Sequence, residues 1–509
     1  MNKTITRGKE ARERVVVGVN AAADAVAPTL GPIGLTALIE YPGLDPITAD
    51  DGITILRNLE FADKHENMGL QLLKKGAMRS STEGKDGTAT TTVLTRAFVN
   101  EAMDEVGDDS SKIREVKERL DKGLEQSLKC LADMKQDVKD EDLERIAEVS
   151  SLDPEVAKLV AEAVRTVGPT GAITVEKGAK LGYSLETVKG MRFERGLISP
   201  YFINDHENAQ TVLEDVHVIL VDRVIATNEQ IVPLLQSIGT GTNILIVATD
   251  IQGVALGTLA TNAMKGIAFI ACVQNPYNAS PAKDFLFDLA AITGATVISE
   301  EMGMKLENAT KELCGKAEKV VITRDTTTVI GGKGDTSVRV KEIEGKIDGS
   351  TNDFGTMKLK DRLAALTGGI GVIRVGAYTD VEYNAKKYKF DNAIASTQAA
   401  VQEGVLPGGG VALWNAASLS TDDIFIKALH APFFQMMENA GMESAEYPKG
   451  TIGTNFHTFE EVDMFEAGII DPHKVVRTAL ESAVAMTKQL IGFETAITIA
   501  EQNTNGETA

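Results

Sequence analysis

The chain has 509 residues, 43% of them hydrophobic and 25% charged, which indicates a globular protein of two to four domains. Its formal net charge of −21 argues against a nucleic-acid partner and for a strongly self-repelling surface. Because the sequence contains no apolar run of about 18 residues or more and no apolar signal core, we expect a cytoplasmic protein with no membrane partner.

The cysteines and histidines indicate neither a disulfide framework nor a zinc site. Cys130, Cys272 and Cys314 lie far apart, so we expect buried, small apolar side chains in a reducing compartment. The six histidines have no metal-ligand spacing.

The first 135 residues are predicted to be mostly helical. An Ala/Val-rich helix from Lys9 ends at Val26, before Pro28. Strand-like segments at Leu35–Tyr41 and Ile53–Leu56 then flank an acidic turn. A helix follows from Asn67 to about Ser80, and a stripe of apolar residues at three- and four-residue spacing predicts a further helix over 113–131.

Between these last two helices lies a glycine- and threonine-rich segment, GKDGTATTT at 84–92. Glycines that open a turn before a helix direct backbone N–H groups and the positive end of the helix dipole to one spot, which suits a phosphate. Asp86 adds a hard oxygen ligand of the kind that Mg²⁺ takes. The alternative is an ordinary helix cap made by the threonine hydroxyls. The chain contains no G-x-x-x-x-G-K-[ST] motif, so this is not a P-loop.

From Ala172 the pattern changes to strands that alternate with helices, which favours an α/β domain with a largely parallel sheet. The expected strands are Ala172–Val175, Tyr183–Val188, Val216–Val221, Asn243–Ala248, Ile267–Val273 and Thr296–Ser299, and the expected helices are Pro154–Thr166, Asn228–Ile238, Val254–Lys265 and Ala282–Leu289.

Long Ala-rich helices return at Phe390–Gln402 and Pro472–Ile491. A domain inserted between two helical halves requires the halves to pair with each other. The chain enters the inserted domain near Gly190 and leaves it near Gly368 and Gly369. These glycines are either hinges or simple turns. A second glycine turn at 408–410 would then face the pocket of the first, and the polar tail Gln502–Ala509 is expected to be disordered.

Eight motifs in this order resemble those of the group I chaperonins, the GroEL type, over almost the whole chain. The motifs are TLGPIG at 29–34, DDGITIL at 50–56, DGTATTTVL at 86–94, GLISPYF at 196–202, ISEEMGM at 298–304, RDTTTVI at 324–330, VQEGVLPGGGVAL at 401–413 and IIDPHKVVRTAL at 469–480.

The resemblance implies a multidomain α and α/β fold with three domains. These are a helical equatorial ATP-binding domain (1–133 plus 404–509), a small intermediate hinge domain (134–189 plus 370–403) and an inserted α/β apical domain that binds substrate (190–369). It also implies an ATPase that assembles into homo-oligomeric rings, usually heptameric, and folds non-native polypeptides. Single and stacked rings, ring size and the use of a co-chaperonin lid are left open.

The resemblance also assigns the nucleotide site, with ATP, Mg²⁺ and K⁺ as cofactors. Asp86 would hold Mg²⁺ and Asp471 would take the ribose. The residues implied at the phosphates are Thr29, Leu30, Gly31, Pro32, Gly87, Thr88, Ala89 and Thr90, and those implied at the base and ribose are Gly409 and Asn455.

Two departures from the family pattern concern charge at the phosphates. Asp50 stands where the family has a lysine, and Lys85 stands where it has a glycine. Our hypothesis is that Lys85 replaces the lost positive charge from the other wall of the pocket. An unchanged ATP affinity in Lys85→Ala would refute it.

A third departure concerns hydrolysis. The family's catalytic aspartate matches Asn392, which can orient a water molecule but cannot take its proton. Asp391 is adjacent but points about 100° away on a helix, so it could act only after a backbone shift. We therefore predict slow hydrolysis with Asp51 as the remaining acid.

Polypeptide binding is implied at apolar positions of the apical domain, which the family uses to hold non-native chains. The implied residues are Leu197, Ser199, Tyr201, Phe202, Val232, Leu235, Leu256, Ala260 and Thr261. The alternative is that these side chains pack the apical sheet.

The sequence suggests three candidate functions. The first is a folding ATPase. The second, suggested by Asn392, is a nucleotide-gated holdase that binds clients but hydrolyses ATP slowly or not at all. The third, a metabolic kinase or ligase, lacks any constellation of residues for a small substrate.

Overall fold

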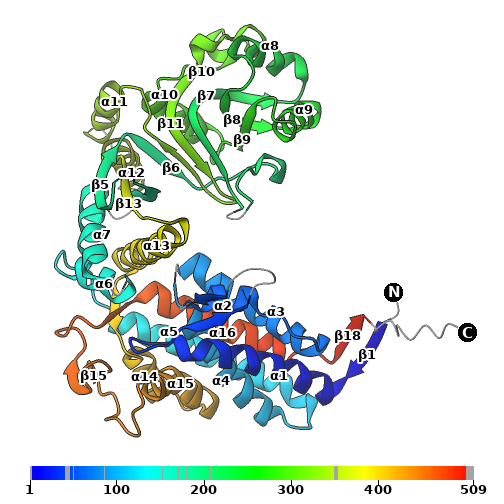
Figure 1. Ribbon diagram of the computed structural model, residues 1–509, viewed down its shortest axis with the longest axis vertical. Helices are drawn as coiled ribbons and strands as arrows, with labels where there is room; N and C mark the ends of the chain where they lie inside the picture. The colour runs from blue at the N-terminus through cyan, green and yellow to red at the C-terminus, as the bar shows by residue number, and fades with distance from the viewer. Residues whose placement is uncertain are drawn as a thin grey trace, which may run out of the picture. The chain divides into compact units, whose positions relative to one another are not determined.

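The computed structural model describes residues 3–40, 46–49, 51–84, 86–151, 153–168, 171–178, 180–206, 209–348 and 353–499. The chain forms two compact units (Figure 1). Unit 1 contains residues 1–161 and 388–509, and unit 2 contains residues 162–387. Among the described residues, no helix is long and apolar enough to cross a membrane. The predicted division into three domains is not tested by these two units and stays a prediction.

Unit 1 is built mainly from helices. Its helices are α1 (Gly8–Val26), α2 (Gly52–Asn58), α3 (Lys64–Arg79), α4 (Thr88–Val106), α5 (Ile113–Met134), α6 (Asp142–Ser151), α14 (Val411–Ser418), α15 (Asp423–Asn439) and α16 (His473–Leu490). Two further helices, α7 (Pro154–Val167) and α13 (Asp380–Glu403), contain the boundaries between the units. The helices predicted at 9–26, 67–80, 113–131 and 472–491 are confirmed.

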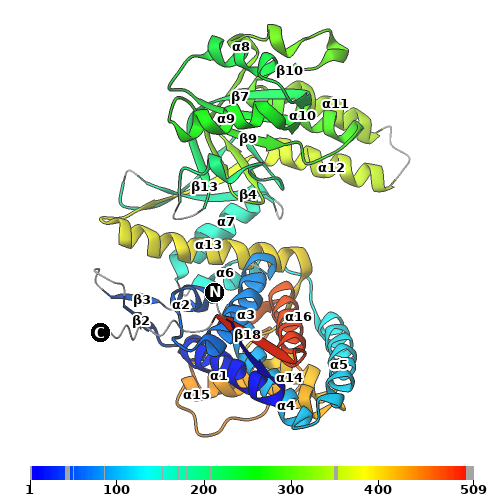
Figure 2. The same cartoon turned by 90° about the vertical axis from the view of Figure 1, so that its right-hand side faces the viewer.

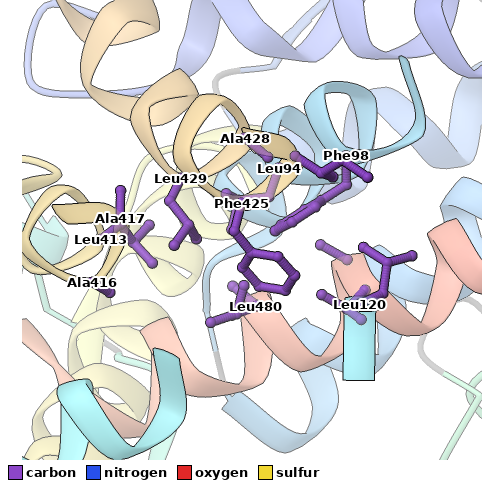
Figure 3. Close-up of a cluster of buried hydrophobic side chains, with 14 of the residues drawn as sticks. Leu94, Phe98, Leu120, Leu413, Ala416, Ala417, Phe425, Ala428, Leu429 and Leu480 are labelled. Atoms are coloured by element: carbon purple, nitrogen blue, oxygen red, sulfur yellow. The ribbon is translucent and has the colours of Figure 1, made fainter. Parts of the chain in front are cut away.

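The two halves of the chain share one core in unit 1, as the sequence predicts. Leu94 and Phe98 of α4 pack with Phe425 of α15 and Leu480 of α16, and all four are fully buried (Figure 3). The rings of Phe98 and Phe425 meet edge to face with centroids 4.9 Å apart. Cys130 also lies in this core, and Cys272 is buried in unit 2, as expected, whereas Cys314 is only half-buried.

Short strand pairs complete unit 1. The first strand β1 (Lys3–Arg7) pairs antiparallel with the last, β18 (Thr495–Ile499), beside the chain ends (Figure 1). The other pairs are β2 (Ala37–Ile39) with β3 (Ile47–Ala49), β14 (Val405–Pro407) with β17 (Ile470–Pro472), and β15 (Ile452–Asn455) with β16 (Glu460–Asp463).

One local prediction is wrong: Ile53–Leu56 is part of helix α2 and not a strand. The Asp51 carboxylate accepts a hydrogen bond from the Thr54 N–H at 2.8 Å and so caps this helix. The apolar side chains of Ile53, Ile55 and Leu56 are buried in the adjoining core. Capping and burial therefore outweigh the preference of the β-branched residues for strands.

Unit 2 is built around a seven-stranded sheet in the order β6-β12-β11-β7-β8-β9, with β10 paired to β7. The strands are β6 (Gly190–Phe193), β7 (Thr211–Ile225), β8 (Asn243–Ile251), β9 (Phe269–Gln274), β10 (Val297–Ile298), β11 (Gly315–Ile322) and β12 (Thr327–Ile330). Pairs among β7, β8, β9 and β10 are parallel, whereas β11 and β12 pair antiparallel with their neighbours. The prediction of a largely parallel sheet is therefore wrong for this half, because the short turn between β11 and β12 permits only antiparallel pairing.

Helices cover both faces of this sheet. On one face, α10 (Ser280–Thr293), α11 (Ser337–Asp348) and α12 (Asp353–Gly368) pack over the buried strand residues, with α11 and α12 side by side (Figure 2). On the other face lie α8 (Asn228–Ile238) and α9 (Gly253–Met264). The predicted helices over 228–238, 254–265 and 282–289 are confirmed.

A separate three-stranded sheet in unit 2 contains β4 (Ala172–Lys177), β13 (Ile370–Gly376) and β5 (Gly182–Val188). The crossing glycines are required by packing: a Cβ at Gly190 would lie 2.3 Å from the Val329 carbonyl oxygen. Gly369 has φ +65°, and its Cβ would lie 2.6 Å from the Val188 carbonyl oxygen. Whether they also act as hinges stays a prediction, and the tail at 502–509 lies outside the described residues.

Candidate functional site

The glycine- and threonine-rich segment forms a tight turn at the start of α4. Gly87 is the N-cap of this helix with φ +85°, and a Cβ there would lie 2.9 Å from Val475 Cγ1. No side chain caps the helix, so the alternative of an ordinary threonine cap is wrong. The first-turn amides of Thr88, Ala89 and Thr90 are therefore left for a ligand, at the positive end of the helix dipole.

Asp86 is held beside this turn by three hydrogen bonds. Its carboxylate accepts from the Gly87 N–H at 2.6 Å and from the Ser396 hydroxyl at 3.2 Å, and its carbonyl oxygen accepts from the Ser80 hydroxyl at 3.0 Å. Burial raises the pKa of Asp86, and the negative charge of Asp51 raises it further. A cation at this position would relieve that repulsion.

The Asp51 carboxylate lies at the N-terminus of α2, which begins against the start of α4. A Cβ at Gly52 would lie 3.1 Å from Thr88 Cγ2 and 3.4 Å from the Ala89 nitrogen. Two of the sequence motifs thus meet: the acidic turn supplies Asp51 and the glycine turn supplies Asp86. Asp50 and Lys85, the two departures in charge, lie outside the described residues.

The segment containing Thr29, Leu30, Gly31 and Pro32 follows α1. The Thr29 hydroxyl donates to the Val26 carbonyl oxygen at 2.8 Å, and Asn439 Nδ2 donates to the Leu30 carbonyl oxygen at 2.8 Å. Gly31 has φ +91°, and a Cβ there would lie 2.7 Å from Met436 Cγ.

Met436 of α15 also lies against the second glycine turn, because a Cβ at Gly410 would lie 3.1 Å from Met436 Cε. The two glycine-containing turns, Gly31 from the first half of the chain and Gly410 from the second, therefore pack against one side chain. This contact does not involve the turn at 84–92, so the expectation that the turns at 84–92 and 408–410 face one pocket stays a prediction.

The second half of the chain contributes Asp471, on β17. A Cβ at Gly408 would lie 3.3 Å from Asp471 Oδ1, so the glycine lets the strands approach. Burial, assisted by the charge of Asp86, raises the pKa of Asp471 to about 6. Asp86 thus interacts electrostatically with both Asp51 and Asp471, although the three residues come from distant segments.

Gly409 and Asn455 lie next to this cluster. Gly409 has φ +62°, and its Cβ would lie 3.7 Å from the Thr454 carbonyl oxygen, so the glycine turn contacts β15. The Asn455 side-chain oxygen accepts from the His457 N–H at 2.9 Å, which fixes a turn after the strand. Both residues are half-buried.

Helix α13 presents Asn392, and also a residue that the sequence interpretation missed, Tyr388. Burial raises the pKa of Tyr388, and the negative charges of Asp51 and Asp86 raise it further. The four-residue spacing between Tyr388 and Asn392 is the signal that would have found it, because residues i and i+4 share a helix face. Asp391, the alternative acid, is exposed, whereas Asn392 is half-buried.

The residues present fit a phosphate-bearing ligand with a cation. Among the described residues, no three His, Cys, Asp or Glu side chains gather closely enough to hold a metal ion by themselves. An ion at Asp86 would therefore depend on ligand oxygens or water for its other contacts. Within the same part of the chain, the buried Thr91 hydroxyl has no hydrogen-bond partner.

The apical positions expected to bind polypeptide fall into two groups. Phe202 and Ala260 are buried in the core beneath α8 and α9. The others are at least partly accessible: Tyr201 and Thr261 are exposed, and Leu197, Ser199, Val232, Leu235 and Leu256 are half-buried. For Phe202 and Ala260 the packing alternative describes the structure, since their side chains are only 3% and 7% exposed.

A groove of about 360 Å³ opens beside these residues. Its lining includes Tyr201, Phe202, Ala263, Met264 and Phe269. Met264 is 66% exposed and Phe269 46% exposed, and neither was singled out from the sequence. Met264 was detectable, because it lies four residues after Ala260 and eight after Leu256, on the same helix face.

Comparison with known proteins agrees with this architecture. The family model described as the TCP-1/cpn60 chaperonin family matches residues 22–499. Two crystal forms of the chaperonin gp146 from the Pseudomonas aeruginosa bacteriophage EL 2, both solved in the presence of ATP-BeFx, have similar folds. They match with TM-scores of 0.73 and 0.66 at 19% and 20% sequence identity, over 98% of this chain and 99% of theirs. The chain thus belongs to the TCP-1/cpn60 chaperonin family, as the eight motifs indicated.

Proposed function

We propose that this protein is an ATP-hydrolysing ring chaperonin that captures non-native polypeptides on apical apolar surfaces and promotes their folding in a chamber. The observation that carries the proposal is Asp86 at the uncapped start of α4, where it interacts electrostatically with both Asp51 and Asp471. The similar phage chaperonin, which was crystallised with ATP-BeFx, supports a nucleotide at such a site.

In the proposed nucleotide complex, the α4 amides and the segment containing Thr29, Leu30, Gly31 and Pro32 hold the phosphates. Asp86 is the protein ligand of Mg²⁺, which when bound supplies positive charge at the phosphates, and K⁺ accompanies it. Asp471 binds the ribose, and Gly409 and Asn455 line the base and ribose. Lys85 remains the hypothesised replacement for the positive charge absent at Asp50.

Hydrolysis in this proposal depends on Asp51 and Asn392. Asp51 is the group that can accept a proton from the attacking water, and its carboxylate is fixed by the Thr54 N–H. Asn392 orients the water without taking its proton. We therefore expect turnover that is slow for a chaperonin. Asp391 would need a shift of the α13 backbone to take part.

A second candidate function is a nucleotide-gated holdase, which binds clients under the control of ATP but hydrolyses it very slowly or not at all. The observation that favours it is the neutral side chain at Asn392. Both candidates share the nucleotide site and differ only in turnover, so one measurement separates them.

The test is steady-state phosphate release from ATP with Mg²⁺ and K⁺, with Asp51→Ala as the blank. Turnover that Asp51→Ala abolishes supports the folding ATPase. Turnover equal to the blank, with ATP still bound in calorimetry, favours the holdase. A protein that binds no ATP refutes both candidates.

Asn392→Asp tests the cause of slow turnover. A carboxylate at this position restores a second proton acceptor, so we expect a faster rate at unchanged ATP affinity. An unchanged or lower rate would show that the asparagine does not limit hydrolysis.

Ring assembly, client binding and a cytoplasmic location belong to the same proposal. The β1–β18 ribbon offers a surface for assembly, since Ile5, Ile497 and Ile499 are each about half-exposed on one face. The groove at Tyr201 and Met264 offers an apolar surface to clients. A lid, if one is used, would dock at this apical surface. Particle mass and capture of an unfolded client are the corresponding tests.

A further inference from the structure

The last residue of α15, Asn439, is bound to the turn that contains residues 29–32. Its side-chain nitrogen, Nδ2, donates to the backbone carbonyl oxygens of Ala27 and Leu30, each at 2.8 Å. The Leu30 N–H also donates to the Ala27 carbonyl oxygen at 3.1 Å. One amide group therefore ties both ends of this turn to α15.

Two further side chains hold the Asn439 amide. Arg96 of α4 donates through Nη2 to Gln435 Oε1 at 2.7 Å, and Gln435 Nε2 donates to Asn439 Oδ1 at 3.0 Å. The Gln435 side chain is buried. Arg96 is itself held by Asp24 of α1, to which its Nη1 donates at 2.8 Å. The three side chains thus form a continuous chain of hydrogen bonds from α4 to the turn.

The direction of each hydrogen bond in this chain is set by the two ends. A guanidinium group can only donate, so Gln435 must turn its oxygen toward Arg96. The Gln435 nitrogen then faces Asn439, which accepts with its own oxygen. The two protons on the Asn439 nitrogen are left for the two backbone carbonyl oxygens, which can only accept. If either amide were flipped, donors would face donors or acceptors would face acceptors.

The ends of the chain belong to two parts of the proposed phosphate site. Arg96 lies on α4, the helix whose start at Thr88 has no side-chain cap. The carbonyl groups that Asn439 binds belong to the turn containing residues 29–32, which would hold the phosphates from another side. The chain therefore fixes the position of this turn relative to α4.

We propose that Asn439 is a positioning residue for the nucleotide phosphates: it holds the turn containing residues 29–32 in register with α4, and Arg96 and Gln435 fix the orientation of its amide. The inference rests on the proposed function, because it assigns a role within that nucleotide site. All three side chains lie outside the eight sequence motifs, and only the tertiary fold brings them together.

The test is Asn439→Leu, which keeps the size of the side chain and removes its amide. We expect the affinities for ATP and ADP with Mg²⁺ in calorimetry to fall about tenfold. KM for ATP should rise by a similar factor while kcat changes by less than about twofold, because the turn binds phosphate in the ground state and the transition state alike. Hydrogen exchange supplies a readout without nucleotide: the Leu30 and Leu35 amides, which donate to the Ala27 and Pro28 carbonyl oxygens, should exchange faster.

Asn100→Leu is the matched control. Asn100 of α4 and Asn20 of α1 form a reciprocal pair of amide hydrogen bonds, at 3.1 and 3.2 Å, and Asn100 is half-buried, as Asn439 is. The control variant therefore loses amide hydrogen bonds of the same kind in the same unit. It should lower stability but leave the ATP affinity and the exchange of the Leu30 amide unchanged.

Substitutions at Arg96 test the chain itself. Arg96→Met removes the donor to Gln435, so we expect the ATP affinity to fall about fivefold, whereas Arg96→Lys keeps a donor and should change it by less than about twofold. In the Asn439→Leu background, Arg96→Met should cause no further loss, because the chain is already broken.

An unchanged ATP affinity in Asn439→Leu, an equal loss in Asn100→Leu, or the same further loss from Arg96→Met in the Asn439→Leu background would each overturn the inference. If Asn439→Leu does not fold, the Arg96 variants decide, since that side chain is 24% exposed, and equal ATP affinities in Arg96→Met and Arg96→Lys would then overturn it. If the unsubstituted protein binds no nucleotide, the proposed function itself fails and the inference falls with it.

Discussion

Asp471 on β17 and Asp86 beside the start of α4 come from opposite halves of the chain, yet the charge of Asp86 helps to raise the pKa of Asp471 to about 6. Burial is the larger cause of this shift. The nucleotide-free protein therefore holds a carboxylate that is costly to ionise. Such a cost is expected where a cation and a ribose hydroxyl are to be bound, and it has measurable consequences for stability.

Asp471→Asn should stabilise the nucleotide-free protein, and more so as the pH rises. The ordinary pKa of Asp471 is 3.8 and its folded value is about 6, so the folded state holds the proton more tightly. The contribution of Asp471 to the free energy of unfolding is thus greatest below pH 4, and it is lost as the pH rises through 6. The full cost, at most about 3 kcal/mol and less with partial solvent exposure, is present at pH 7. An asparagine at position 471 removes this cost of ionisation.

The measurement is urea denaturation of both proteins at pH 5 and pH 8. Asp463→Asn is the control of opposite sign, because hydrogen bonds from Thr451 and the Glu466 N–H lower the pKa of Asp463. That variant should lose stability, whereas Asp471→Asn should gain it and bind ATP more weakly. A gain that is the same at both pH values would refute the electrostatic explanation.

Gly87→Ala should abolish tight nucleotide binding. At φ +85° an alanine is strained by about 1–2 kcal/mol, and its Cβ would lie 2.9 Å from Val475 Cγ1 and 3.3 Å from Ser80 Oγ. The turn must therefore shift and take the α4 amides with it. We expect ATP affinity in calorimetry to fall at least about tenfold.

Gly168→Ala is a matched control for this substitution. Gly168 has nearly the same backbone angle, φ +82°, but no atom lies within 4 Å of its added Cβ. It should show the cost of backbone strain and keep its ATP affinity. Equal losses of affinity in the two variants would mean that the Gly87 turn has no special part in binding.

The sequence predicted best where the periodicity of apolar residues decides the structure. The stripe over 113–131 becomes α5, and the alternating segments from 211 to 293 become the strands and helices of unit 2. It failed at Ile53–Leu56, where a single capping carboxylate outweighs strand propensity. It also failed for β11 and β12, since pairing direction depends on the connection and not on strand composition.

Within the candidate site, motifs located Asp51, Asp86 and Asp471, but not what acts on them. The pKa values depend on burial and on approach between distant segments, which no local pattern encodes. Tyr388 was missed because only the tertiary fold brings it within reach of the Asp51 charge. Met264 was missed for a similar reason, since its exposure depends on the surface around α9.

The β1–β18 ribbon leads to a prediction about assembly. Ile5 and Ile497 are paired across the two strands and are 54% and 51% exposed, so two large apolar side chains lie together on the surface of the ribbon. Among the described residues, neither strand has a second partner. Such open edges and apolar faces are normally covered, and a neighbouring subunit is the occupant that a ring provides.

Replacing both isoleucines, Ile5→Lys with Ile497→Lys, should shift the protein from ring-sized particles to smaller species in light scattering coupled to gel filtration. Leu419→Lys, at an apolar residue that is 71% exposed elsewhere in unit 1, should leave the particle mass unchanged. If the double variant keeps its full mass, assembly does not depend on this ribbon.

The groove lined by Tyr201 and Met264 should carry much of the affinity for non-native clients. Both side chains are about two-thirds exposed, and the buried Phe202 lines the same groove. Burying a large apolar side chain against a client contributes about 1.5–3 kcal/mol, so Tyr201→Ser with Met264→Ser should weaken capture of a denatured client at least about tenfold. The measurement is fluorescence anisotropy of a labelled, unfolded client without nucleotide.

Val338→Ser, at an apolar residue of α11 that is 77% exposed and does not line the groove, is the matched control. Equal affinities in the control and the double variant would mean that clients bind elsewhere on the protein.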